Sequence, residues 1–228
     1  MKANFLFAAA AALAMAGAAQ AAPTLLTSDT TYTGPDLDLS GYDNGSYNFT
    51  FGPVAVGDFT FIGAPGGGGN SGLGSVVGQG GYGLAGNGSF GLPAVYIGVD
   101  SGTGYAQLLG AIAYSQIGFF FNYAPGVGDN ATISTLDAGG AVIDSWDLTV
   151  LAPISTPGGF NAFEFRGVAH DTADIYGLRF GGNYILASGT ATGDIPGIPE
   201  PATWAMMIIG FAGVGAALRS RRRTAVAA

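Results

Sequence analysis

The chain has 228 residues, of which only 10% are charged, and its formal net charge is −8. Between residues 22 and 198 the only basic residues are Arg166 and Arg179, against fourteen acidic ones. Such a region repels nucleic acid, whose binding requires clustered Lys and Arg, so nucleic acid is excluded as a partner. The absence of cysteine excludes thiol catalysis, cysteine metal sites and disulfides.

The N-terminal segment, residues 1–21, has the three parts of a secretory signal peptide. Lys2 gives a positive start, and Phe5–Ala18 is an apolar run rich in alanine. Ala19 and Ala21 form a small-residue cleavage site of the A-x-A kind. The run is short for a membrane span, which argues against an anchor that remains uncleaved. We therefore expect a signal helix that signal peptidase removes after Ala21.

Residues 22–187 are predicted to form one β domain, because short apolar runs alternate with Gly, Asn, Asp and Pro. Several runs have a period of two residues, and Phe119–Phe121 is continuous, as in a strand covered on both faces. The pattern predicts an all-β fold, a β-sandwich of jelly-roll type, without an amphipathic helix of useful length. The expected strands are Tyr47–Phe51, Asp58–Ile62, Ala94–Val99, Gln116–Tyr123, Ala131–Leu136, Ala141–Val150, Ala162–Val168, Ile175–Phe180 and Tyr184–Ala187.

A glycine-rich stretch interrupts this pattern at residues 63–91, with fourteen glycines in twenty-nine positions. We predict a long flexible loop there. Two G-x-G-x-x-G matches begin at Gly78 and Gly86. Both lack the preceding strand and the following helix that a nucleotide site requires. Residues 188–198 are predicted to be a linker.

Early in the domain, Asp36, Asp38 and Ser40 are spaced like the first half of a calcium loop. Tyr47 stands where an EF-hand has its bidentate glutamate, so that motif is excluded. Two interpretations remain open: a different oxygen cage for calcium, completed by Asp43, and a simple polar turn. No other cofactor is expected.

Catalytic side chains are sparse. His170 is the only histidine, with Asp171 beside it and Asp174 nearby, and no nucleophile motif accompanies it. We expect it at the surface or at a strand end. Glu164 alternates with two phenylalanines and is expected to face solvent. The chain is therefore not expected to be an enzyme, since a hydrolase would need His170 and two acids in one cleft.

The C-terminal segment, residues 199–228, opens with a proline motif followed by an apolar run. Trp204–Leu218 carries no charge and can form a helix of roughly 22 Å, which flanking residues can extend across a membrane. The positive-inside rule keeps the following arginine cluster cytoplasmic and places the domain on the periplasmic side of the inner membrane. The motif consists of Pro199, Glu200, Pro201 and Trp204, and the cluster of Arg219, Arg221, Arg222 and Arg223.

This order of motif, apolar helix and arginine cluster resembles the PEP-CTERM sorting signal, in the variant with Trp204 and Ala205 after the prolines. The resemblance implies recognition by an exosortase, a membrane-embedded cysteine protease-transpeptidase. It also implies a cut near Pro199–Pro201 and transfer of the body to the cell surface or exopolysaccharide matrix. An ordinary tail anchor is the alternative, since hydropathy and arginines alone would fit it.

The remaining resemblance concerns the domain. Residues 117–185 resemble the lectin-like sandwich domains of exported PEP-CTERM proteins. We therefore expect an exported, non-enzymatic protein associated with exopolysaccharide. The alternative is a carbohydrate-binding module in which exposed tyrosines or Trp146 stack on sugars. A row of aromatic side chains on one sheet face would favour that alternative.

Overall fold

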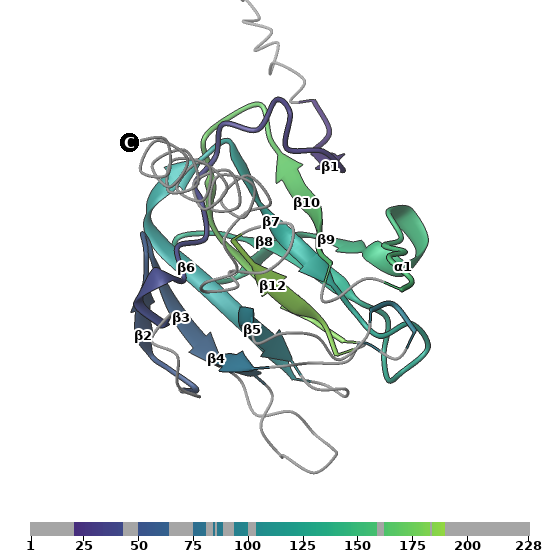
Figure 1. The fold of residues 1–228 in the computed structure, drawn as a ribbon. Helices are drawn as coiled ribbons and strands as arrows, with labels where there is room; N and C mark the ends of the chain where they lie inside the picture. The colour runs from purple at the N-terminus through teal and green to yellow at the C-terminus, as the bar shows by residue number, and fades with distance from the viewer. Residues whose placement is uncertain are drawn as a thin grey trace, which may run out of the picture.

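The regular structure of the described residues is almost entirely β. Within them, two antiparallel sheets of six strands each are accompanied by one turn of α-helix and a 3-10 turn (Figure 1). The all-β prediction is therefore confirmed. The computed structural model describes residues 21–42, 50–63, 75–80, 84, 86–88, 94–99, 104–158, 162–182 and 184–189.

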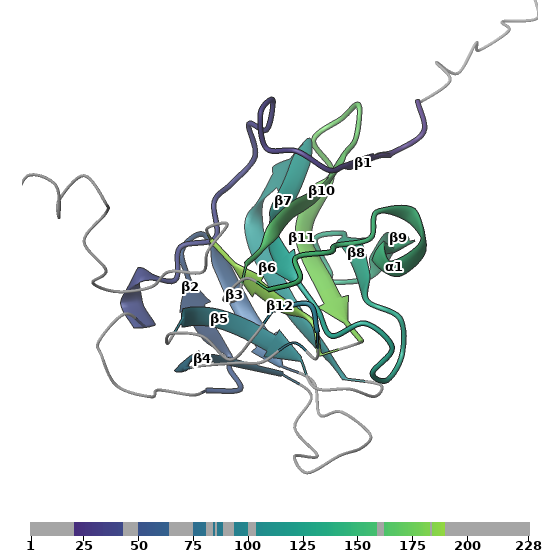
Figure 2. The same cartoon turned by 45° about the vertical axis from the view of Figure 1, so that its right-hand side comes forward.

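The two sheets are formed by strands that are far apart in the sequence. In spatial order, the first sheet contains β1 (Thr24–Leu26), β10 (Glu164–Ala169), β7 (Gln116–Asn122), β12 (Leu186–Ser188), β5 (Ala94–Val99) and β4 (Ser75–Gly80). The second contains β2 (Val54–Val56), β3 (Phe59–Gly63), β6 (Tyr105–Tyr114), β11 (Ile175–Gly181), β8 (Thr132–Leu136) and β9 (Val142–Asp147). Outside the sheets are η1 (Ser40–Tyr42) and α1 (Leu148–Leu151), which lies beside β9 (Figure 2).

Aromatic rings fill the space between the sheets. On β7, Phe119 and Phe121 alternate with Phe120 and point into the main core. The ring of Phe119 meets that of Phe59 on β3 edge to face at 5.7 Å, and Phe121 meets Phe180 on β11 at 5.4 Å. Each contact joins one sheet to the other, so the two sheets pack face to face. Burying each ring stabilises the fold by roughly 1.5–3 kcal/mol.

The glycine-rich stretch is not wholly a loop, and the prediction for residues 63–91 is wrong for β4. Ser75–Gly80 pairs in register with β5, from Ser75 opposite Val99 to Gly80 opposite Ala94. The ladder to a neighbouring strand outweighs the poor strand propensity of glycine, because strand formation depends strongly on its partners. Leu84 and Asn87, farther along the stretch, are also buried.

Other strands differ in their bounds. The predicted strand over residues 141–150 ends at Asp147, because the Asp147 carboxylate accepts from the Val150 N–H and caps α1. The patterns missed β6, whose interior Gly110 resembles a turn residue, as well as the three-residue strands β1 and β2. A Cβ at Gly110 would lie 3.3 Å from the Tyr176 carbonyl oxygen, so a side chain there would require a small local shift.

Both chain ends fall beyond the described ranges. Residues 1–20 and 190–228 include most of the predicted signal peptide, nearly all of the linker and the whole sorting tail. Most of the predicted strand Tyr47–Phe51 is also outside them. Among the residues that the structure describes, no helix has the length and apolar character needed to cross a membrane.

The segment before η1 covers the part of β7 that extends past the end of β12. Ser188, the last residue of β12, lies opposite Phe120 of β7. Beyond that point Tyr32 and Thr33 cover the edge of β7: the Gly118 N–H donates to the Tyr32 hydroxyl at 3.0 Å. The Thr33 N–H donates to the Gln116 side-chain oxygen, also at 3.0 Å. Tyr32 and Thr33 therefore lie beside the part of β7 that extends past the last paired residue of β12.

Candidate functional site

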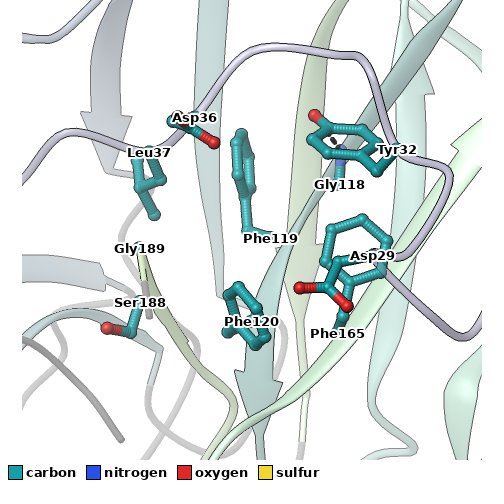
Figure 3. Close-up of a pocket in the computed structure, with 10 residues that line it drawn as sticks. All are labelled: Asp29, Tyr32, Asp36, Leu37, Gly118, Phe119, Phe120, Phe165, Ser188 and Gly189. Atoms are coloured by element: carbon teal, nitrogen blue, oxygen red, sulfur yellow. Dashed lines mark hydrogen bonds between the residues drawn. The ribbon is translucent and has the colours of Figure 1, made fainter. Parts of the chain in front are cut away.

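A cavity of about 180 Å³ opens where β12 ends. At about 30 Å³ per water molecule, it holds roughly six waters, which is below the usual range for drug-sized ligands. Phe119 and Phe120 lie at its centre, with Asp36 and Leu37 on one side and Asp29, Tyr32 and Phe165 on the other (Figure 3). The remaining lining residues are Gly118, Ser188 and Gly189.

Three aromatic rings form a row beside this cavity. Phe120 on β7 and Phe165 on β10 are direct partners in the antiparallel register, so their side chains leave the same face. Their centroids are 5.6 Å apart, and the Tyr32 ring lies 4.9 Å from Phe165. Phe165 is only 5% exposed, whereas Tyr32 and Phe120 are half-buried. The two outer rings of the row are therefore open to contact.

The Tyr32 hydroxyl has a structural role. It donates to the Pro35 carbonyl at 2.7 Å and accepts from the Gly118 N–H. Burial raises the pKa of Tyr32, the Gly118 bond opposes that shift, and the negative charge of Asp36 adds to it. The phenol therefore stays neutral and holds its ring in place.

Asp29 and Asp36 supply the charge of the site. Both are exposed, and they approach the cavity from opposite sides (Figure 3). No Lys or Arg is among the lining residues of the described structure. The arrangement can therefore accept hydrogen bonds from hydroxyl or ammonium groups, and it repels anions.

Of the residues proposed for calcium, Asp36 and Asp38 lie on one side of an extended segment. Leu37 and Leu39 are buried in the core, so Asp36 and Asp38 point outward by the two-residue alternation of an extended segment. Asp38 accepts from the Ser40 N–H at 2.9 Å, and hydrogen bonds from Ser40 lower the pKa of Asp38. Asp43 lies outside the described residues. Within them, no three His, Cys, Asp or Glu side chains are placed to hold a metal ion.

His170 follows β10, as a strand-end histidine should, but the surface alternative is wrong for its side chain. The imidazole is only 6% exposed. Its Nδ1 lies 2.7 Å from Asp174, and its Nε2 lies 3.5 Å from Asp144 on β9. Packing of the β10–β11 turn against β9 buries the ring, which a lone histidine in a sequence does not reveal. None of these three residues lines the cavity.

Glu164 and Trp146 also lie away from the cavity. Glu164 is 38% exposed, as its alternation predicts, and it pairs with Arg166 at 2.8 Å. Arg166 is 4% exposed and donates further bonds to the carbonyls of Ala152 and Pro153. Trp146 is half-buried and packs against the main core from β9 of the second sheet.

The sequence indicated only part of this site. The continuous Phe119–Phe121 run predicted a strand covered on both faces, and Phe120 indeed packs on the outer cluster with Leu186. No pattern linked Tyr32 or Asp29 to that strand, because their proximity arises from chain topology. Of the predicted signal-cleavage pair, Ala19 lies outside the described residues, and Ala21 is exposed.

The comparisons with known proteins concern the tail. A family model described as the PEP-CTERM protein-sorting motif matches residues 197–223, which include Pro199, Glu200, Pro201 and Trp204. No curated protein and no solved structure matches the chain. The chain thus carries a PEP-CTERM sorting motif, the membrane-anchored sorting signal of an exported protein that an exosortase targets.

Proposed function

We propose that this protein is a non-enzymatic component of the cell surface or extracellular matrix, associated with exopolysaccharide. Its body is a jelly-roll, lectin-like unit that the tail holds on the periplasmic side of the inner membrane. An exosortase then cuts near Pro199–Pro201 and releases the body. The order of the chain supports this, because β12 ends at Ser188 and the motif match begins at residue 197. The cut therefore leaves every described strand intact.

The sorting motif carries this proposal, and replacing Pro199, Glu200 and Pro201 with alanine tests it. In cells that contain the exosortase, the unaltered protein is expected in the surface and medium fractions. The triple variant should accumulate uncut in the inner membrane. Pro196→Ala, just outside the motif, is the matched control and should behave like the unaltered protein. Equal distribution of the triple variant and the control would contradict the proposal.

The row of Tyr32, Phe165 and Phe120 favours a second candidate function, carbohydrate binding. Aromatic faces pack against the C–H faces of sugar rings, and nearby carboxylates accept hydrogen bonds from sugar hydroxyls. The row adjoins a cavity with two carboxylates, Asp29 and Asp36. That combination suits one ring of a saccharide chain, with the neighbouring rings outside.

Calorimetric titration with a panel of hexasaccharides tests this second candidate. The mature protein should bind at least one of them, and Phe120→Leu should weaken that binding about tenfold by removing a stacking face. Phe51→Leu is the control, since Phe51 is 41% exposed and does not line the cavity. Failure to bind any member of the panel, with both proteins folded, would exclude this function.

A further inference from the structure

We propose that the cavity at the end of β12 selects an amino sugar with a free, protonated amine over neutral, acetylated and acidic sugars. The proposal rests on the carbohydrate-binding function above and names its ligand class. It follows from three properties of the site: two outer aromatic faces, a cavity of one-ring size and a purely negative set of charged side chains.

The rings account for the sugar part of the ligand. Tyr32 and Phe120 are half-buried and flank Phe165, which is 5% exposed. The planes of Tyr32 and Phe120 are inclined to that of Phe165 by 55° and 74°, so a flat apolar face of a pyranose can rest on one outer ring at a time. The thin side chain of a lysine would leave them uncovered. A ligand that carries an amine on a ring therefore fits better than a basic peptide.

The charges account for the amine. Asp29 and Asp36 approach the cavity from two sides, so both carboxylates attract an ammonium group held between them (Figure 3). Exposed ion pairs of this kind favour binding by about two- to fivefold each at low salt. Two of them give a preference of about tenfold for the free amine over its acetylated form.

Acidic sugars are excluded because neither arginine of the body serves this cavity. Arg166 is committed to Glu164 and to the carbonyls of Ala152 and Pro153. Arg179 belongs to the second sheet, where it stacks on Tyr105 at 4.2 Å. A uronate or sulfate group at the cavity would therefore face two carboxylates without a compensating cation.

The test compares hexamers of glucosamine, N-acetylglucosamine, glucose and galacturonate by calorimetry at about pH 5.5, where the sugar amine is charged. The mature protein should bind the glucosamine hexamer about tenfold more tightly than the acetylated one. This preference should fall at higher salt, because exposed charges are screened. The galacturonate hexamer should not bind.

Asp29→Asn combined with Asp36→Asn isolates the cause, because the amides keep the shape and remove the charge. The double variant should reduce the affinity for the glucosamine hexamer to about that for the acetylated one. Asp58→Asn combined with Asp171→Asn is the control for net charge, since both residues are exposed and do not line the cavity. This control should keep the full preference.

The outcomes separate the two proposals. Equal binding of the glucosamine and acetylated hexamers by the unaltered protein overturns the amino-sugar inference and leaves carbohydrate binding in place. The amino-sugar inference is also overturned if the Asp58 and Asp171 control variant loses the preference as the Asp29 and Asp36 variant does. Net charge, and not the position of the two carboxylates, would then be the cause. If no hexamer binds, carbohydrate binding itself fails, and the inference fails with it.

Discussion

The outer faces of the two sheets differ in chemistry. The first sheet presents aromatic rings and the cavity, covered in part by the segment around Leu84 and by Tyr32. On the second sheet a polar row crosses four strands in register: Gln107, Arg179, Ser134 and Ser145. Arg179 bonds Gln107 at 2.8 Å, and the two serine hydroxyls are 2.9 Å apart.

The polar row of the second sheet pairs mostly within the sheet, Arg179 with Gln107 and Ser134 with Ser145. Its pairing is not complete, because Arg179 Nε and the Thr135 hydroxyl on β8 have no hydrogen-bond partner within the described structure. The first sheet has incomplete strand pairing beside β7, and a short segment fills the gap imperfectly. The cavity lies in the resulting space, and it is the site where we propose that a saccharide binds. The predictions below test the shared core first and then each face.

The largest effect is expected in the core that both faces share. Phe121→Ala removes a ring with 0% exposure that contacts Phe119 and Phe180. We expect a loss of about 4 kcal/mol in the free energy of unfolding, measured by urea denaturation. Phe51→Ala, at an exposed position, should cost less than about 1 kcal/mol. Similar losses in the two variants would show that Phe121 is not part of the core between the sheets.

The next prediction compares the two sheets through one arginine in each, Arg166 on β10 and Arg179 on β11. Arg166→Ala removes a buried guanidinium that serves Glu164 and three carbonyls, and we expect a loss of about 3 kcal/mol. Arg179→Ala removes a stack on Tyr105 and bonds to Gln107 and Gly140, with an expected loss of about 1.5 kcal/mol. Denaturant unfolding measures both. The reverse order would contradict the assigned burial of Arg166.

A substitution of Asn87 tests whether the residues that lie over the outer face of the first sheet, here called the cover, are held there by hydrogen bonds. Its side-chain amide donates to Asn122 and Ile154, both at 2.8 Å, and its oxygen accepts from the Thr156 N–H at 2.7 Å. Asn87→Ala should cost about 2 kcal/mol, because buried groups lose their partners. Amide hydrogen exchange should also become faster around Thr156. Thr31→Ala, at an exposed turn position, is the control, and equal effects would indicate that the cover is loose.

The smallest effect concerns the end of the second sheet. Partial burial alone would raise the pKa of Asp147, but hydrogen bonds from Thr149, Asn130 and Val150 hold it below its ordinary value. The stability that this carboxylate contributes is thus present above about pH 4 and is lost as pH falls through the folded-state pKa.

Asp147→Ala should therefore cost about 1 kcal/mol at pH 7, as loss of a helix cap does, and less at pH 2. Urea unfolding at both pH values measures this difference. A cost that is the same at both pH values would mean that the charged form is not the stabilising one. Asp58→Ala, in an exposed turn, controls for general charge effects.

Much of this arrangement follows from the sequence. A continuous apolar run predicted the strand around Phe119, two-residue alternation predicted the one around Phe165, and the order of residues in the tail predicted the sorting motif. These are local patterns. The site needs the register that places Phe120 opposite Phe165 and the contact that brings Tyr32 to Gly118. The spacing of residues in the sequence does not reveal such long-range contacts. For the same reason β4 was not predicted: its residues are rich in glycine, and only the pairing with β5 makes them a strand.

The central claim is that an exosortase separates a folded body from its sorting tail, and the mass of the mature protein tests it most directly. The full chain is expressed in a host with its exosortase and in the same host without it, and the purified body is weighed by mass spectrometry. We predict a chain from Ala22 to near Pro199–Pro201 in the first host and one that still ends at Ala228 in the second. An intact Ala228 end in both hosts would contradict the claim and indicate a permanent tail anchor.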